Sequence, residues 1–268
     1  MRVSRKARYA LLAGLVLGLV VIYFPLLLVV VNSFNASTTF GWPPSRLTLE
    51  WWRRALGDTG ALTALGTSVV AGLAATAIAL VLGTMIAFAL QRYRFFGRDA
   101  LSLLVILPIA LPGIVTGIAL NNAFRTILGI HLGLLTAIIA HATFCIVVVF
   151  NNVVARLRRM GRRLAEASMD LGADGPTTFR LVTFPMLRSA LLAGGLLAFA
   201  LSFDEIIVTT FTLGAGQQTL PIWILDNLFR PNQAPVVNVV AAVLVVLSVV
   251  PVHLAQRLSG DTTGGGRL

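Results

Sequence analysis

Charged side chains are scarce in this chain, and lysine is almost missing. Only 12% of the 268 residues are charged, and Lys6 is the sole lysine; a soluble domain carries about 25% charged residues. A phosphate-binding P-loop needs a lysine, so the chain is predicted to hold no such ATP site. The single cysteine, Cys145, rules out a disulfide within one chain. The three histidines are scattered and show no metal-ligand spacing, so we expect no bound cofactor, no metal and no enzyme activity.

Apolar residues make up the bulk of the sequence. They reach 57% of the chain, and the mean hydropathy is +0.89. The apolar runs are continuous rather than alternating, which favours helices over a β-barrel. Since about 20 apolar residues cross a hydrocarbon core of roughly 30 Å, six runs are long enough to span. They lie near residues 9–31, 62–90, 101–120, 134–155, 189–213 and 236–255.

These runs predict an all-α membrane protein with six transmembrane helices. The spans form a single transmembrane domain over residues 1–255, and the Gly-rich tail 256–268 is predicted to be disordered.

Basic residues are distributed unequally between the two sides of the predicted bundle. One side holds sixteen, and the other holds five. The sixteen are Arg2, Arg5, Lys6, Arg8, Arg92, Arg94, Arg98, Arg156, Arg158, Arg159, Arg162, Arg163, Arg180, Arg188, Arg257 and Arg267; the five are Arg46, Arg53, Arg54, Arg125 and Arg230. The positive-inside rule therefore places both termini and the loop 156–188 in the cytoplasm. Because these residues lie between membrane runs, they indicate topology and not a nucleic-acid partner.

The loop 156–188 carries the most specific pattern in the chain. A helix-forming stretch ends at Gly172, which can adopt the left-handed conformation that terminates helices. Asp174 can cap a second short helix, and Pro185 marks a bend into the fifth run. The expected shape is helix, sharp turn, helix, bend, which forms a compact knob. Its key residues are Glu166, Ala167, Ser168, Gly172, Ala173, Asp174 and Pro185.

This pattern resembles the EAA loop of ABC-importer permeases, which docks on a separate ATPase. The chain departs from the usual motif only by Ser168 for Ala, Val182 for Ile and Phe184 for Leu. Four other segments resemble the spermidine/putrescine permease family. They are Ser33-Phe-Asn-Ala-Ser37, Leu49-Glu-Trp-Trp52, Ser202-Phe-Asp-Glu-Ile-Ile-Val208 and Thr219-Leu-Pro-Ile-Trp223.

The resemblance implies the transmembrane domain of a type I ABC importer in the bacterial inner membrane. It implies a coupling helix between the fourth and fifth spans. It also implies several partners: a second related permease, two ATPase subunits that bind ATP and Mg, and a periplasmic solute-binding protein. The solute implied is a polyamine such as spermidine or putrescine, with another small solute as the alternative.

Asp204 and Glu205 are the only acidic residues inside the predicted spans. A carboxylate in a membrane should face protein or water, so one of them is a candidate for the solute pathway. An ion pair with Arg230, Arg125 or the partner subunit, or proximity to the headgroups, is the structural alternative. A proton-coupled secondary transporter would use the same carboxylates as its proton site. The coupling loop, the small number of spans and the lack of visible inverted repeats argue against that class.

Three further features inside the spans predict helix packing. Pro108 and Pro112 predict kinks in the third run. Gly113 and Gly117 allow a neighbouring helix to approach closely. His141 is predicted to form hydrogen bonds between helices rather than to bind a ligand.

Overall fold

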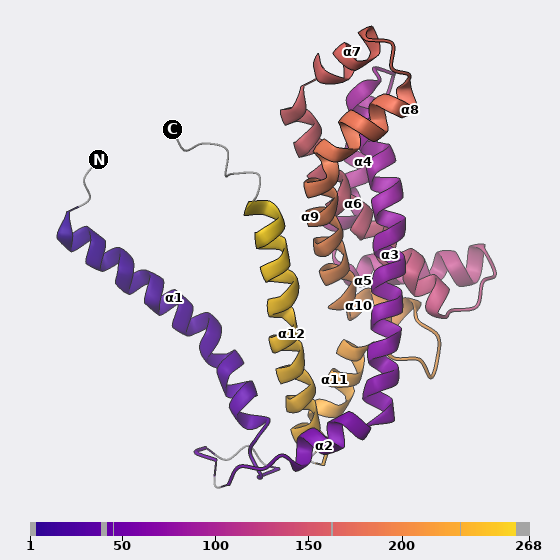
Figure 1. The fold of residues 1–268 in the computed structure, drawn as a ribbon. Coiled ribbons are helices and arrows are strands. Elements are labelled where there is room, and N and C mark those ends of the chain that lie inside the picture. Colours follow the sequence, from indigo (N-terminus) through magenta and orange to yellow (C-terminus); the bar gives the residue numbers. More distant parts are fainter. Residues whose placement is uncertain (1–3, 39–41, 45, 162, 231, 261–268) are drawn as a thin grey trace. The chain divides into compact units, whose positions relative to one another are not determined.

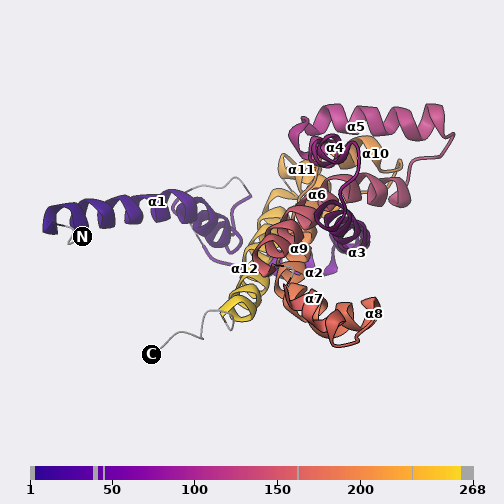
Figure 2. The same cartoon turned by 90° about the horizontal axis from the view of Figure 1, so that it is seen from above.

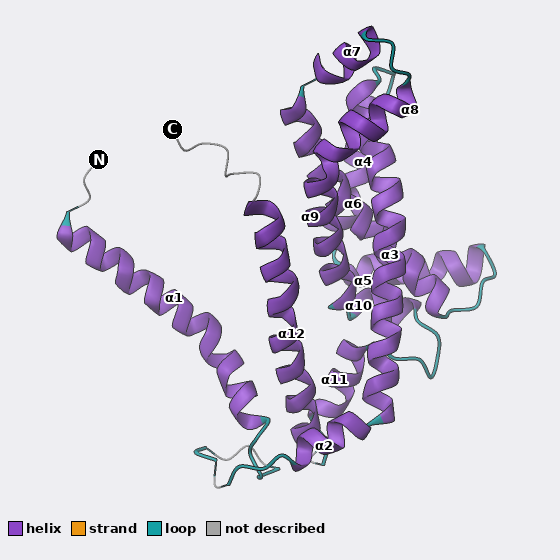
Figure 3. Cartoon of the chain, in the orientation of Figure 1, coloured by secondary structure: helices purple, strands orange, loops and turns teal. Residues whose placement is uncertain are grey.

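The computed structural model describes residues 4–38, 42–44, 46–161, 163–230 and 232–260, and this part contains helices joined by loops, without strands (Figure 3). The chain divides into two compact units. The first comprises Met1–Leu62 and Trp223–Val250, and the second comprises Thr63–Ile222 and Pro251–Leu268. The single domain expected over residues 1–255 stays a prediction.

The first unit contains α1 (Arg5–Asn32), α2 (Glu50–Gly57), the first turn of α3 (Thr59–Arg92) and most of α12 (Ala234–Gly260). The helix α1 is apolar on all sides and has no buried residue. A helix of this kind is stable only when lipid or another protein surrounds it. The segment between α1 and α2 is tied down by Trp51, whose indole N–H donates to the Asn35 carbonyl at 2.9 Å.

The second unit is built around α6 (Leu134–Met160), which carries the largest set of buried residues (Figure 1). It packs against α9 (Phe184–Phe203), and also against α4 (Arg98–Ala110) and α10 (Ile207–Thr212). Glycines allow these helices to approach closely. A Cβ added at Gly83 of α3 would lie 2.9 Å from the Ile146 carbonyl oxygen, and one at Gly194 of α9 would lie 3.3 Å from Val149 Cα.

Four helices are long and apolar enough to cross a membrane. They are α1, α3, α6 and the helix Gly175–Phe203, and a sharply bent pair of helices, α4 with Gly113–Ile127, is a fifth candidate. The apolar stretch Ala234–Leu247 of α12 is shorter than these membrane-spanning candidates. The helix itself continues to Gly260, beyond the expected end of the sixth span at 255. Three of the six predicted spans, 9–31, 62–90 and 134–155, are thus found within single helices long enough to cross a membrane, and the count of six stays a prediction. The remainder of the predicted tail, 261–268, lies outside the described residues.

The third run is broken rather than kinked. Its two halves, α4 and the helix Gly113–Ile127 that begins with α5 (Gly113–Asn122), meet at 105°. Leu111 precedes Pro112 and adopts extended backbone angles (φ −83°, ψ 144°). The proline ring clashes with the residue before it when that residue has helical backbone angles, so the helix ends here. The predicted change of direction at Pro112 is therefore confirmed, but its angle is that of a break and not of a kink.

The helix α5 runs alongside α10, as Figure 2 shows. Close approach depends on Gly117, because a Cβ added there would lie 2.7 Å from the Phe211 ring. The side-chain amide of Asn121 donates to the Phe211 carbonyl at 2.5 Å. The prediction that Gly113 and Gly117 line a close helix contact is confirmed.

Candidate functional site

The predicted knob consists of α7 (Arg163–Asp170), a tight turn and α8 (Gly175–Thr178). Gly172 has a φ of +91°, the left-handed conformation expected for a residue that ends a helix. The N–H of Gly172 donates to the Met169 carbonyl at 2.9 Å, and the N–H of Ala173 donates to the Ser168 carbonyl at 3.1 Å. These bonds satisfy carbonyls that the end of a helix leaves free.

Asp174 caps α8, as the sequence predicts. Its Oδ1 accepts a hydrogen bond from the Thr177 N–H at 2.9 Å, and Pro176 lies in the first turn, where no N–H is needed. Hydrogen bonds from the Thr177 side chain and backbone hold the pKa of the Asp174 carboxyl below its ordinary value. The hydroxyls of Ser168 and Thr178 lie 3.1 Å apart and join α7 to α8.

The surface of the knob is open and partly apolar. Glu166 and Ala167 are exposed, Leu171 at the tip is 89% exposed, and Leu164 and Met169 are also exposed. In Figure 1 the α7–α8 turn lies at one end of the second unit, beyond the ends of α6 and α9. Exposed leucine and methionine side chains gathered around a rigid turn are typical of a protein-docking surface.

The second short helix continues into the fifth run without a non-helical break, and the bend predicted at Pro185 stays a prediction. A π-helical turn at Phe179–Thr183 joins α8 directly to α9, so that one helix extends over Gly175–Phe203. Pro185 falls in the first turn of α9. The wider π-helical turn before it accommodates the missing N–H, because such turns relax the regular hydrogen-bond ladder.

Two contacts anchor the base of the knob to neighbouring helices. The Arg156 side chain at the end of α6 donates from Nε to the Met186 carbonyl of α9 at 2.8 Å. The ring of Phe179 packs edge-on against Phe88 of α3, with centroids 5.8 Å apart. These contacts join the knob and the end of α6 to α9 and α3.

Asp204 and Glu205 do not lie within a continuous helix, which corrects the predicted fifth span of 189–213. The helix α9 ends at Phe203, and α10 begins at Ile207. Glu205 Oε1 accepts a hydrogen bond from the Val208 N–H at 2.8 Å and so caps α10. A negative charge is favourable there, because the N-terminus of a helix carries free N–H groups.

The two carboxylates consequently differ in their surroundings. Asp204 is exposed, whereas Glu205 is half-buried and engaged in the cap. Within the described residues, neither carboxylate forms an ion pair with Arg125. Of the two carboxylates, Asp204 is the more exposed, and its place in a solute pathway stays a prediction.

The side chain of His141 on α6 contacts both helices that flank the break, α9 and α10. Its Nδ1 lies 2.7 Å from the Ser202 hydroxyl, and its Nε2 lies 2.8 Å from the Thr209 hydroxyl. The imidazole is fully buried. The predicted interhelical role of His141 is confirmed, although its partners, one on each side of the break, were not visible in the sequence.

A second side chain of α6, Thr136, also forms a hydrogen bond to α10, and the sequence did not predict it. Thr136 at the start of α6 donates to the carbonyl of Thr212, at the end of α10, at 2.7 Å. A threonine in an apolar run gives no sign of a partner 76 residues away.

Comparison with known proteins agrees with this architecture. Residues 79–261 match the family described as binding-protein-dependent transport system inner membrane component. The chain is 34% identical over 244 residues to the spermidine/putrescine transport system permease protein PotC of Escherichia coli (strain K12), covering 91% of both chains. It is 33% identical over 240 residues to the putrescine transport system permease protein PotI of the same strain, covering 86% of this chain and 83% of the relative.

Two solved structures share the fold. A chain of a bacterial ABC transporter involved in the import of the acidic polysaccharide alginate has a TM-score of 0.70 at 17% identity, covering 98% of this chain and 99% of the other. A chain of the MetNI methionine ABC transporter, in an inward-facing conformation, has a TM-score of 0.60 at 19% identity, covering 81% and 100%. The chain thus belongs to the family of inner-membrane permease subunits of binding-protein-dependent ABC importers.

Proposed function

We propose that this chain is one of the two permease subunits of an ATP-driven importer for a polyamine such as spermidine or putrescine. The observation that carries the proposal is the α7–α8 turn, an exposed knob whose geometry depends on Gly172, Asp174 and the Ser168–Thr178 contact. In this role the knob is the coupling helix and docks on an ATPase subunit. ATP and Mg bind to that subunit and not to this chain.

The proposed assembly contains a second, related permease, two ATPase subunits and a periplasmic binding protein that delivers the solute. Six spans cross the inner membrane: α1, α3, the bent pair of α4 with Gly113–Ile127, α6, Gly175–Phe203 and α12. Both termini and the knob face the cytoplasm. The excess of sixteen basic residues over five on that side supports this orientation.

Coupling would then follow the continuous helix of α8 and α9. ATP binding on the partner displaces the knob, and the helix Gly175–Phe203 carries the displacement to the break at Asp204 and Glu205. At that point His141 holds both helix ends against α6. A helix ending at a fixed hinge allows a rigid-body movement that exposes the pathway alternately to the two sides.

The names of the two curated relatives support a polyamine as the solute. The exposed carboxylate of Asp204 is consistent with a cationic solute, since two unit charges about 4 Å apart attract by about 4 kcal/mol at an effective dielectric near 20. Asp204 would offset part of the hydration that an ammonium group loses on entering the pathway.

The test is reconstitution of the chain with a second permease and an ATPase of the same organism, followed by ATPase assays with the binding protein and a panel of amines. Spermidine or putrescine should stimulate hydrolysis, and neutral solutes of similar size should not. Stimulation by a non-amine alone would refute the solute assignment. Failure of the chain to form a complex with any ATPase would refute the coupling role.

A further inference from the structure

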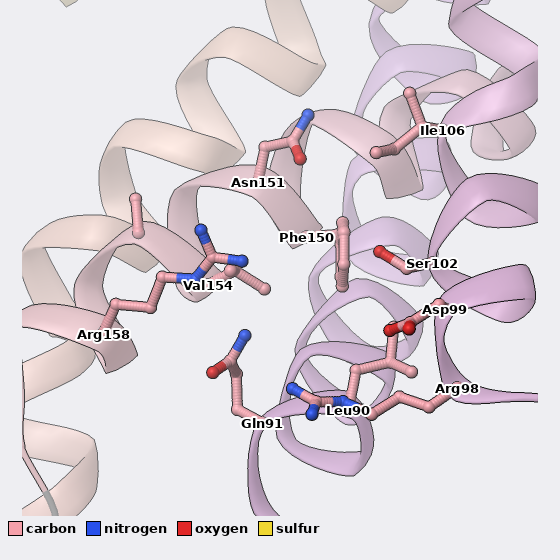
Figure 4. Close-up of a pocket in the computed structure, with 11 residues that line it drawn as sticks. Leu90, Gln91, Arg98, Asp99, Ser102, Ile106, Phe150, Asn151, Val154 and Arg158 are labelled. Carbon is pink, nitrogen blue, oxygen red and sulfur yellow. The ribbon is translucent and has the colours of Figure 1, made fainter. Parts of the chain in front are cut away.

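A cavity lies in the second unit, and its lining includes no residue of the knob or of the break at Asp204. It has a volume of about 330 Å³ and is enclosed by the end of α3, the start of α4 and the last turns of α6 (Figure 4). This volume is at the small end of the range of about 300–1,000 Å³ typical of ligand pockets. The cavity therefore suits a headgroup-sized ligand and not a long acyl chain.

The lining of the cavity contains both polar and apolar residues. Its polar lining residues are Gln91, Arg98, Asp99, Ser102, Asn151 and Arg158. Leu90, Ile106, Phe150 and Val154 complete the wall. In Figure 4 the side chains of Arg98, Arg158 and Gln91 surround the same opening.

The charges of this lining favour an anion. Two guanidinium groups and one carboxylate leave a net charge of one positive unit. Within the described residues, neither Arg98 nor Arg158 forms an ion pair with a carboxylate. A phosphodiester carries one negative charge, and arginine binds phosphate oxygens with charge-assisted hydrogen bonds.

The loop that forms one edge of the cavity indicates where such a phosphate comes from. Between α3 and α4, Tyr93 is 67% exposed and Phe96 is fully exposed, and Arg92, Arg94 and Arg98 lie among them. Exposed aromatic rings interleaved with arginines are typical of the headgroup layer of a membrane. Basic residues close to a membrane span attract anionic lipids.

We propose that this cavity binds the phosphate of an anionic phospholipid, with Arg98 and Arg158 as the main ligands. Gln91, Ser102 and Asn151 supply neutral polar groups around the same opening, and Tyr93 and Phe96 lie in the adjoining headgroup layer. The site joins α3, α4 and α6, so a bound lipid would stabilise the contact between these three helices. The proposal does not depend on the identity of the solute or on the ATPase.

The experiment measures lipid binding to the purified full-length chain in mild detergent by native mass spectrometry, together with its thermal unfolding. The probes are phosphatidylglycerol, phosphatidylcholine with the same acyl chains, and inorganic phosphate. We expect phosphatidylglycerol to bind and to raise the unfolding temperature more than phosphatidylcholine does. Equal binding of both lipids would overturn the proposal, and so would full competition by millimolar phosphate alone, which would show that no lipid is required.

Three variants locate the site. Arg98→Gln and Arg158→Gln should each weaken phosphatidylglycerol binding about tenfold or more, because each removes a charged hydrogen-bond donor. Arg94→Gln is the matched control: it removes the same charge from the same loop but does not line the cavity, so binding should change less than about twofold. Equal losses in all three variants would mean unspecific attraction and would overturn the proposal.

Asp99→Asn separates an anion site from a cation site. Removal of the carboxylate should tighten phosphatidylglycerol binding, because it removes a repulsive charge from the lining. If the variant instead weakens binding, or if spermidine displaces the lipid from the wild-type chain, the cavity belongs to a cation pathway and the proposal fails. The wild-type comparison of lipids keeps the test decisive even where a variant does not fold.

Discussion

Replacement of Gly172 tests the coupling role most directly, because its effect can be derived from one backbone angle. The residue has a φ of +91°, and a Cβ added there would meet no atom within 4 Å. Any penalty is therefore conformational and not steric. An L-residue in the left-handed region pays about 1–2 kcal/mol, and a difference of this size changes an equilibrium by a factor of about 5–30.

We expect Gly172→Ala to weaken binding of the ATPase subunit by about this factor of 5–30, and Gly172→Val to weaken it further, because β-branched residues tolerate positive φ least. Gly172→Asn should fall between glycine and alanine, since asparagine adopts the left-handed region more readily. The knob would lose its closed turn in a fraction of the molecules, while the bundle stays folded. The assay is the affinity of the detergent-solubilised permease for its ATPase, with transport in vesicles as the second readout.

Gly175→Ala is the matched control. Gly175 is also free of neighbours within 4 Å, but it lies in α8 without a positive φ. Alanine adds no left-handed strain at this position, which is the first residue of α8, so this variant should bind the ATPase about as well as the wild type. Wild-type binding by Gly172→Ala, or equal damage from both alanine variants, would refute the reasoning.

Three further predictions concern topology and the break in the fifth run. Cysteines introduced at Ser37 and at Gly172, with the single native cysteine replaced, should be labelled from opposite sides of the membrane; labelling of both by an impermeant reagent in intact cells would contradict the orientation. Asp204→Asn should lower polyamine uptake in vesicles and leave the unfolding temperature unchanged, whereas Glu205→Gln should destabilise α10 by about 0.3–1 kcal/mol, because the amide keeps the acceptor oxygen but loses the negative charge at the helix N-terminus; wild-type uptake by the Asp204 variant would remove it from the pathway. His141→Ala should destabilise the bundle by about 1–3 kcal/mol, since it leaves the buried Ser202 hydroxyl without its partner and removes one of the two hydrogen bonds of the Thr209 hydroxyl, which also donates to the Glu205 carbonyl; an unchanged thermal unfolding curve would show that Ser202 finds another partner.

Several features followed from the sequence because their causes are local. A bilayer admits a backbone only when its polar groups are bonded internally, so long apolar runs such as 134–155 had to be helices. Gly172 and Asp174 end and begin helices through their own backbone and side chain. These elements appear where they were expected, with Gly172 at φ +91° and the Asp174 cap in place.

The break after Phe203 was not predictable in the same way. Residues 189–213 form one apolar run, and Asp204 and Glu205 alone do not stop a helix. The chain breaks there because Glu205 caps α10, and because the hydroxyls of Ser202 and Thr209 meet the imidazole of His141 on another helix. None of these partners is close to His141 in the sequence.

What the sequence determined by itself was therefore where the long apolar helices lie and where Gly172 ends and Asp174 begins the two helices of the knob, since each depends on hydropathy or on backbone angles within a few residues. Only the tertiary structure decided how far the chain bends at Pro112, which carboxylate caps α10, and which polar side chains meet around the cavity at Arg98 and Arg158. Those outcomes depend on which groups lie opposite one another across helices. Hydropathy constrains that relation only weakly, because an apolar helix in a membrane can present any of its faces to lipid.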